Sequence, residues 1–193
     1  MILLCIVTIF SKSTTANADD RYVKLCERYF TEFAEDYGKF GQKDGFTYLY
    51  SDKKNTATIV AIPMEQKKVA VPEKINGKTV TKIELMDVFS CSSNYYFRDE
   101  FYGEHEDNPV PKVEYLSIPK TVKVINIYAG IGLTEGYCGE LQSYLVHLKK
   151  FNVASANKWY RSYKGMLYTK NGKKLLLVPR KYMAKTVKVK KGT

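Results

Sequence analysis

The chain has 193 residues, a length that suits one elongated domain, and its 16 tyrosines and 9 phenylalanines supply ample apolar area for a core. Its formal net charge is +11. It contains no Gly-x-Ser-x-Gly, His-Glu-x-x-His or phosphate-binding loop, and nothing in the sequence sets its two histidines, His105 and His147, beside a cysteine. We therefore expect neither an enzyme nor a bound cofactor.

Residues 1–18 have the pattern of an export signal. Met1 to Phe10 is almost entirely apolar, a length typical of a signal-peptide core and too short to span a bilayer. Ala16-Asn17-Ala18 then supplies a small-x-small cleavage site. We predict a signal peptide over 1–18, a mature start near Asp19 and no stable membrane insertion. No basic residue precedes the apolar run, and the alternative is a buried N-terminal strand.

Residues 20–37 have the periodicity of an amphipathic helix, with apolar side chains about 3.6 residues apart. These side chains are Tyr22, Leu25, Cys26, Tyr29, Phe30, Phe33, Ala34 and Tyr37. Gly38 follows, where a glycine commonly ends a helix. We predict that 19–45 is a capping helix and linker that covers the first repeat of the segment after it. The alternative is a helix that binds a partner or a membrane surface.

Two short apolar segments end in proline and are followed by similar phrases. Val69-Ala-Val leads into Pro72, and Leu116-Ser-Ile leads into Pro119. Proline lacks an N–H donor, so it ends a strand. The two prolines are 47 residues apart, which is about two repeats of 20 to 29 residues. Each strand has too few inward apolar residues for its own core, so we expect stacked repeats that bury Val113, Leu116, Ile118, Leu148, Phe151 and Val153.

An insertion rich in aromatic and charged residues, 94–112, separates the repeats. Its aromatic residues are Tyr95, Tyr96, Phe97, Phe101 and Tyr102, and we predict that they form a contact loop for a protein or sugar. The segment from Glu104 to Asp107 contains three acids and a histidine. Adjacent residues of one short loop rarely converge on one ion, so we predict a solvated acidic loop and no metal site.

The stretch from Asn157 to Pro179 has the features of a β-hairpin. Met166-Leu-Tyr-Thr and Lys174-Leu-Leu-Leu flank Asn171-Gly172, a pair that tolerates positive φ at both central positions of a tight turn. We therefore predict a hairpin that turns at these two residues.

The positive charge is concentrated near the C-terminus. Residues 141–193 contain fourteen lysines and arginines and no acid, whereas 19–140 carry a net charge of about −4. Such a field attracts polyanions. We predict that Lys149, Lys150, Lys173 and Lys174 contact an anionic glycan or wall polymer. The alternative is a solvated outer face. The export signal and the lack of a recognition motif argue against nucleic acid.

Together these segments resemble the BspA-type leucine-rich repeat family of bacterial secreted and cell-surface proteins, over residues 46–193. The resemblance rests on the proline-ended strands, on the insert from Asn157 to Pro179 and on the eight-residue spacing of Ile83 and Cys91. The repeats are degenerate, since Gly130 stands where the family has Phe and Cys138 comes 13 residues after Ile125.

The resemblance implies an α/β, β-rich, right-handed solenoid with an N-terminal capping helix and an open repeat at the C-terminus. Strands are expected near 69–71, 115–118, 149–153 and 175–178, and Cys91 and Cys138 are expected to be buried thiols. The implied function is a secreted or surface-exposed binding module that adheres to a host or cell-surface protein or to an anionic glycan. The alternative is a structural spacer, one fragment of a larger surface protein with the binding or catalytic part elsewhere.

Overall fold

The structure, a computed structural model, describes residues 38–85, 110–126, 145–183, 186–189 and 191–193, together with Lys24, Glu27, Arg28 and Thr31. These four single residues have helical backbone and exposed side chains, and the elements of the described residues are all β-strands. The predicted signal peptide and most of the predicted helix lie outside the described residues, so the capping helix has no support here. Within the described part, no helix is long and apolar enough to cross a membrane.

The first three strands form an antiparallel meander: β1 (Lys39–Lys43), β2 (Phe46–Ser51) and β3 (Thr56–Ala61). Asp44 and Gly45 connect β1 to β2, both at positive φ (52° and 78°), as a type I′ hairpin turn requires. The sequence pattern favours a linker here, because Phe40 is the one large apolar residue of β1. Pairing with β2 makes the segment a strand instead.

The meander continues into a parallel ladder. β6 (Lys78–Ile83) runs parallel to β3, and β8 (Val124–Ile125) runs parallel to the C-terminal part of β6. β5 (Lys74–Ile75) pairs antiparallel with the start of β6 through the turn Asn76-Gly77. β3 is the first strand of this ladder, and β2 and β1 continue the sheet on its other side. The sequence pattern predicts a helical cap at this position.

A second, wholly parallel sheet consists of β4 (Lys68–Ala70), β7 (Tyr115–Ile118) and β9 (Lys150–Val153). It confirms the strands predicted near 69–71, 115–118 and 149–153. In its register Lys68 lies opposite Tyr115, and Tyr115 lies opposite Lys150. Because β4 and β7 are direct neighbours, the 47 residues from Pro72 to Pro119 span one step of the sheet. The prediction of two repeats in that interval is therefore wrong.

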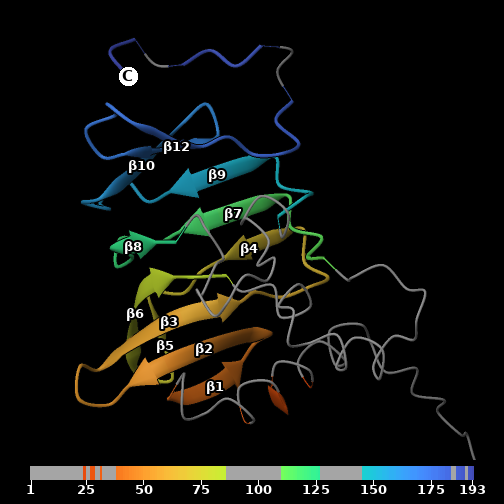
Figure 1. The fold of residues 1–193 in the computed structure, drawn as a ribbon, viewed down its shortest axis with the longest axis vertical. Coiled ribbons are helices and arrows are strands. Elements are labelled where there is room, and N and C mark those ends of the chain that lie inside the picture. Colours follow the sequence, from red (N-terminus) through yellow and green to blue (C-terminus); the bar gives the residue numbers. More distant parts are fainter. Residues whose placement is uncertain are drawn as a thin grey trace, which may run out of the picture.

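The two parallel ladders rise together along the long axis of the molecule (Figure 1). After Pro72 the chain passes from β4 into β5 and β6, and after Pro119 it passes from β7 into β8. The N–H of Val71 donates to the carbonyl of Ser117, so the pairing continues to the residue before the proline. Each proline thus stands at a corner between the ladders, where strand pairing ends.

The last three strands form a separate antiparallel sheet: β10 (Tyr160–Tyr163), β11 (Met166–Thr169) and β12 (Leu175–Leu177). The hairpin predicted at Asn171-Gly172 is confirmed, although Gly172 alone of that pair has positive φ, at 72°. Thr169 donates its N–H to the Lys174 carbonyl at 3.0 Å, so the turn has four residues. The strand expected near 175–178 forms β12, which pairs with β11 in this hairpin and does not join β4, β7 and β9 in the parallel sheet. The short loop between β11 and β12 favours this pairing.

The β10–β11 hairpin also closes the last edge of both parallel ladders. Exposed edges of a sheet carry unpaired N–H groups that invite pairing with another chain. Here three of those donors find acceptors in the hairpin. The N–H of Phe151 donates to the Gly165 carbonyl at 2.8 Å, the N–H of Val153 donates to Ser162 Oγ at 3.2 Å, and the N–H of Ile125 donates to Tyr160 Oη at 3.1 Å.

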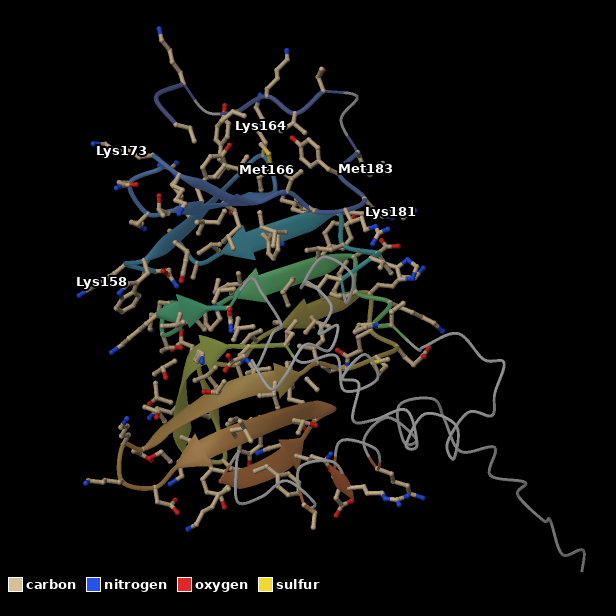
Figure 2. All side chains as sticks on the ribbon, in the orientation of Figure 1. Lys158, Lys164, Met166, Lys173, Lys181 and Met183 are labelled. Carbon is tan, nitrogen blue, oxygen red and sulfur yellow. The ribbon has the colours of Figure 1, made fainter. Side chains whose placement is uncertain are left out.

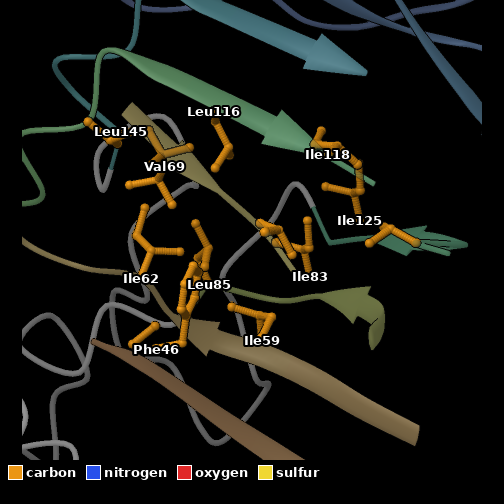
Figure 3. Packing of buried hydrophobic residues seen from close by; sticks show 14 of the residues in the cluster. Phe46, Ile59, Ile62, Val69, Ile83, Leu85, Leu116, Ile118, Ile125 and Leu145 are labelled. Atoms are coloured by element: carbon orange, nitrogen blue, oxygen red, sulfur yellow. The ribbon is translucent and has the colours of Figure 1, made fainter. Parts of the chain in front are cut away.

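One apolar core runs from Phe46 to Leu177 and joins all three sheets. Ile59, Ile83 and Ile125 are paired in register across β3, β6 and β8, so they stack in one line that Figure 3 shows from close by. The residues predicted to point inward lie in this core. Val113, Leu116, Ile118, Leu148 and Phe151 are buried, and Val153 is half-buried against them.

Candidate functional site

The parallel sheet β4-β7-β9 has one side on the core and the other toward solvent. Successive side chains of a strand point to opposite faces, so Val69, Leu116 and Phe151 enter the core. Their neighbours form what we call the outer face, two rows of residues across the sheet. The rows are Lys68, Tyr115 and Lys150, and Ala70, Ser117 and Asn152. The first row places positive charge on both sides of an aromatic ring.

Three hollows lie next to one another beside this face, and we call them together the groove. Their volumes are about 480, 290 and 350 Å³. The first and second share Ser117 and Asn152, and the second and third share Val153 and Ala154. Because neighbouring hollows share walls, an extended ligand can lie across all three.

The groove is basic at both ends. In the first hollow, Lys68 Nζ lies 6.0 Å from the centre of the Tyr115 ring. In the third, Arg161 and Lys170 line the wall, and Lys170 Nζ donates to the carbonyl oxygen of Ser155 at 2.7 Å. Within the part of the chain that the structure describes, no acidic residue lines any of the three hollows. Such a surface attracts anionic groups and repels cations.

Five acidic residues of the described chain are instead paired with lysines that do not line the groove. Asp52 pairs with Lys39 and Lys78, and Glu65, Glu73, Glu84 and Glu114 pair with Lys112, Lys120, Lys82 and Lys149 respectively. No acid among the described residues pairs with Lys68. The lysines therefore fall into two groups. Some have their charge balanced by an acid within the fold, and others, such as Lys68, keep a charge that can bind a ligand.

The structure divides the first predicted lysine pair. Lys150 is exposed at the end of the first row of the outer face. Lys149 lies 2.9 Å from Glu114, and this hydrogen bond raises the pKa of the lysine and lowers the pKa of the glutamate. Lys149 therefore stays protonated, and its positive charge is balanced by the carboxylate of Glu114. Of the two lysines, only Lys150 adds an unpaired positive charge to the outer face.

The second predicted pair, Lys173 and Lys174, lies in the exposed turn between β11 and β12. Figure 2 shows Lys173 on the side of the molecule where β9 ends, whereas Lys150 lies at the other end of β9, as its first residue. The four predicted lysines therefore do not form one cluster.

The predicted aromatic contact loop, Tyr95, Tyr96, Phe97, Phe101 and Tyr102, lies outside the described residues, as do His105, Cys91 and Cys138. In the part of the chain that the structure describes, no three His, Cys, Asp or Glu residues gather closely enough to hold a metal ion.

Lys68, Tyr115 and Arg161 are groove residues that the sequence analysis missed. A signal for the first two exists, because Lys68 stands four residues before Pro72 and Tyr115 four residues before Pro119. Aligning the two prolines therefore aligns the row. Arg161 has no such signal, since its place depends on how the β10–β11 hairpin packs on the sheet.

These features define a β-rich protein with two parallel ladders and a basic surface groove. No known protein family and no curated protein matches the chain. Two solved structures overlap it. One is a leucine-rich repeat protein from Eubacterium ventriosum ATCC 27560, with a TM-score of 0.34 and 22% identity, over 61% of this chain and 22% of that one. The other is the pneumococcal vaccine antigen PcpA, with a TM-score of 0.30 and 16% identity, over 81% of this chain and 60% of that one.

The chain thus spans less than two thirds of the length of either protein. At these TM-scores the superpositions do not establish a shared fold. The architecture of the chain rests on its own strand pairing.

Proposed function

We propose that this chain is a non-catalytic binding module of a secreted or surface-exposed protein, and that its groove binds an anionic glycan or wall polymer. The observation that carries the proposal is the groove, a line of three neighbouring hollows with Lys68 at one end, Arg161 and Lys170 at the other, and no acid among its described lining residues. Exposed cations arranged along a groove speed the capture of a polyanion and hold it along its length.

The proposed architecture is a leucine-rich repeat solenoid of the BspA type. Support comes from the two ladders, since the strands of each are paired in parallel, and each corner after β4 and β7 has a proline. Parallel strands joined by crossovers are right-handed in about 98% of cases, so we propose a right-handed solenoid. An experimental structure in which β4 and β7 are not paired would contradict it.

The binding test uses the full chain and immobilised heparin as the polyanion. We expect retention at low salt and release near about 0.5 M salt, because exposed charges are then screened. The double variant Lys68→Gln and Lys170→Gln should elute at clearly lower salt. The matched control, Lys173→Gln with Lys174→Gln, removes the same charge from the β11–β12 turn and should elute close to the wild type.

Equal shifts for the two double variants would mean that net charge, and not the groove, retains the polymer. If the wild-type chain is not retained at all, the module is the structural spacer instead.

Secretion is proposed from the signal-like residues 1–18. Expression of the chain with its N-terminus intact in a bacterial host should yield an exported product whose first residue lies near Asp19. An uncleaved product retained inside the cell would contradict both the signal and the surface location.

A further inference from the structure

The first hollow, of about 480 Å³, has walls of different chemistry. One wall is the half-buried ring of Tyr115 with Lys68 Nζ above it. Ser117 and Asn152 form another, and Ala70 leaves the space open because its side chain is small. An aromatic ring, an ammonium group and two hydrogen-bonding side chains thus meet around one volume.

The strand register keeps these groups in place. Tyr115 and Ser117 are two residues apart on β7, so both point to the outer face, and Asn152 lies opposite Ser117 on β9. Neighbouring strands are about 4.8 Å apart, so the groups sit at spacings that the backbone fixes. The volume is also within the usual range for small-molecule sites, roughly 300 to 1,000 Å³.

We propose that this hollow is a subsite for one acidic pyranose residue, a sugar ring that carries a carboxylate. The apolar C–H face of the sugar packs on the Tyr115 ring, its carboxylate pairs with Lys68, and its hydroxyl groups hydrogen-bond Ser117 and Asn152. This inference rests on the proposed function, since the rest of the glycan runs along the groove. It adds recognition of the sugar ring to the attraction of charge.

Charge alone does not require Tyr115, and this separates the subsite from a general polyanion surface. Lys68 attracts any anion that reaches it, whereas the ring of Tyr115 stabilises only a ligand that has an apolar face to stack on it. A carboxylate polymer without sugar rings therefore serves as the comparison ligand.

The experiment measures the dissociation constants of hyaluronan oligosaccharides and of poly-glutamate of similar charge for the full chain. Tyr115→Leu should weaken hyaluronan binding by about five- to tenfold and change poly-glutamate binding by less than about twofold. Tyr115→Phe keeps the ring and should bind hyaluronan within about twofold of the wild type. Lys68→Gln should weaken both ligands.

Tyr163 provides the matched control, because Lys164 Nζ lies 5.5 Å from the centre of its ring and neither residue is among those lining the groove. Tyr163→Leu should leave hyaluronan binding unchanged. Thermal melts of each variant separate loss of contact from loss of fold, and Tyr115→Phe keeps the test valid if Tyr115→Leu does not fold. In that case, weaker hyaluronan binding by Lys68→Gln together with full binding by Tyr115→Phe supports the subsite.

Equal loss of both ligands in Tyr115→Leu, or tight poly-glutamate binding without hyaluronan binding, would overturn the sugar subsite and leave the basic groove standing. If the wild type binds neither ligand, the proposed function fails with it.

Discussion

Asn157 is a buried polar side chain whose hydrogen-bonding capacity is fully used. Its amide nitrogen donates to the carbonyls of Pro119 and Val122 at 2.8 and 3.0 Å, and its side-chain oxygen accepts from the N–H groups of Trp159 and Tyr160, each at 2.8 Å. It therefore ties the corner after β7 to the start of β10. A buried amide is tolerated because both donors and both acceptor positions are satisfied.

Asn157→Ala should cost about 2 to 4 kcal/mol of unfolding free energy, because it leaves buried backbone groups without partners. Asn152→Ala removes the same amide from an exposed position and should cost less than about 0.5 kcal/mol. Urea denaturation of the two variants measures the difference. Equal costs would mean that the corner is held by other contacts.

Asp52 connects β1 to β6 from the turn between β2 and β3. It lies 2.7 Å from Lys39 and 2.6 Å from Lys78, and the hydrogen bonds from Lys39 and then Lys78 lower its pKa from 3.8 to about 2. A carboxylate whose pKa is lower in the folded state stabilises the fold above its unfolded pKa, and this contribution disappears as the pH falls through the folded pKa.

Asp52→Asn should therefore lower the melting temperature slightly at neutral pH. The difference from the wild type should shrink between about pH 4 and pH 2, where the wild-type carboxylate takes up its proton. Thermal melts over this range test it, with Asp44→Asn as control, since no acid–lysine pair of the described residues includes Asp44. A difference that stays constant down to pH 2 would contradict the role of the ion pairs.

At the scale of elements, two hairpin turns have the same backbone but different surroundings. Asn76-Gly77 and Lys164-Gly165 both have positive φ at each residue, with the glycines at 76° and 86°. A Cβ on Gly77 would meet nothing within 4 Å, whereas a Cβ on Gly165 would lie 3.0 Å from Cγ of Lys150. Gly165 is therefore needed for its conformation and also for the close approach of the hairpin to β9.

Replacing either glycine by alanine should cost about 1 to 3 kcal/mol from backbone strain alone. Gly165→Ala should cost more than Gly77→Ala, because its new methyl group also meets Lys150. Combining Gly165→Ala with Lys150→Ala should recover that excess, as chemical denaturation of the single and double variants would show. Absence of any recovery would place the cost of Gly165→Ala in the backbone only.

Prediction from sequence succeeded for elements whose signals are local. The strands before Pro72 and Pro119 and the hairpin around Gly172 follow from alternation, proline and turn residues within a few positions. The hairpin signal also gives β12 its partner β11, although the apolar run that ends in Pro179 looks like the parallel strands. Prediction failed for β1, whose strand character comes from pairing with β2.

For the whole molecule, the continuous core couples the three sheets. Leu116 is 2% exposed at the centre of the parallel sheet, so Leu116→Ala should cost about 2 to 5 kcal/mol. Val124 is 47% exposed, and Val124→Ala should cost less than about 0.5 kcal/mol. Hydrogen exchange should show weaker protection of both β3 and β11 in Leu116→Ala. Loss confined to the parallel sheet would show that the sheets unfold independently.

The distribution of charge also depends on the tertiary structure of the whole molecule. Glu114 directly precedes β7 and Lys149 directly precedes β9, so the two paired residues are far apart in the sequence. Glu114→Gln should free Lys149 and raise the salt concentration at which the chain leaves a heparin column. Lys149→Gln alone should change elution less than Lys68→Gln. The opposite ranking would mean that the Lys149 ion pair opens for the ligand.

The sequence by itself determined where the strands before prolines and the hairpin turn around Gly172 form, since proline, glycine and alternation act on the residues beside them. It also determined the excess of positive charge in 141–193. The tertiary structure decided that β4, β7 and β9 pair with one another, that Lys68, Tyr115 and Lys150 form one row, and that the charge of Lys149 is balanced by Glu114. The physical reason is that these contacts join residues more than thirty positions apart in the sequence. Their geometry is set by the packing of a shared core, which no local pattern contains.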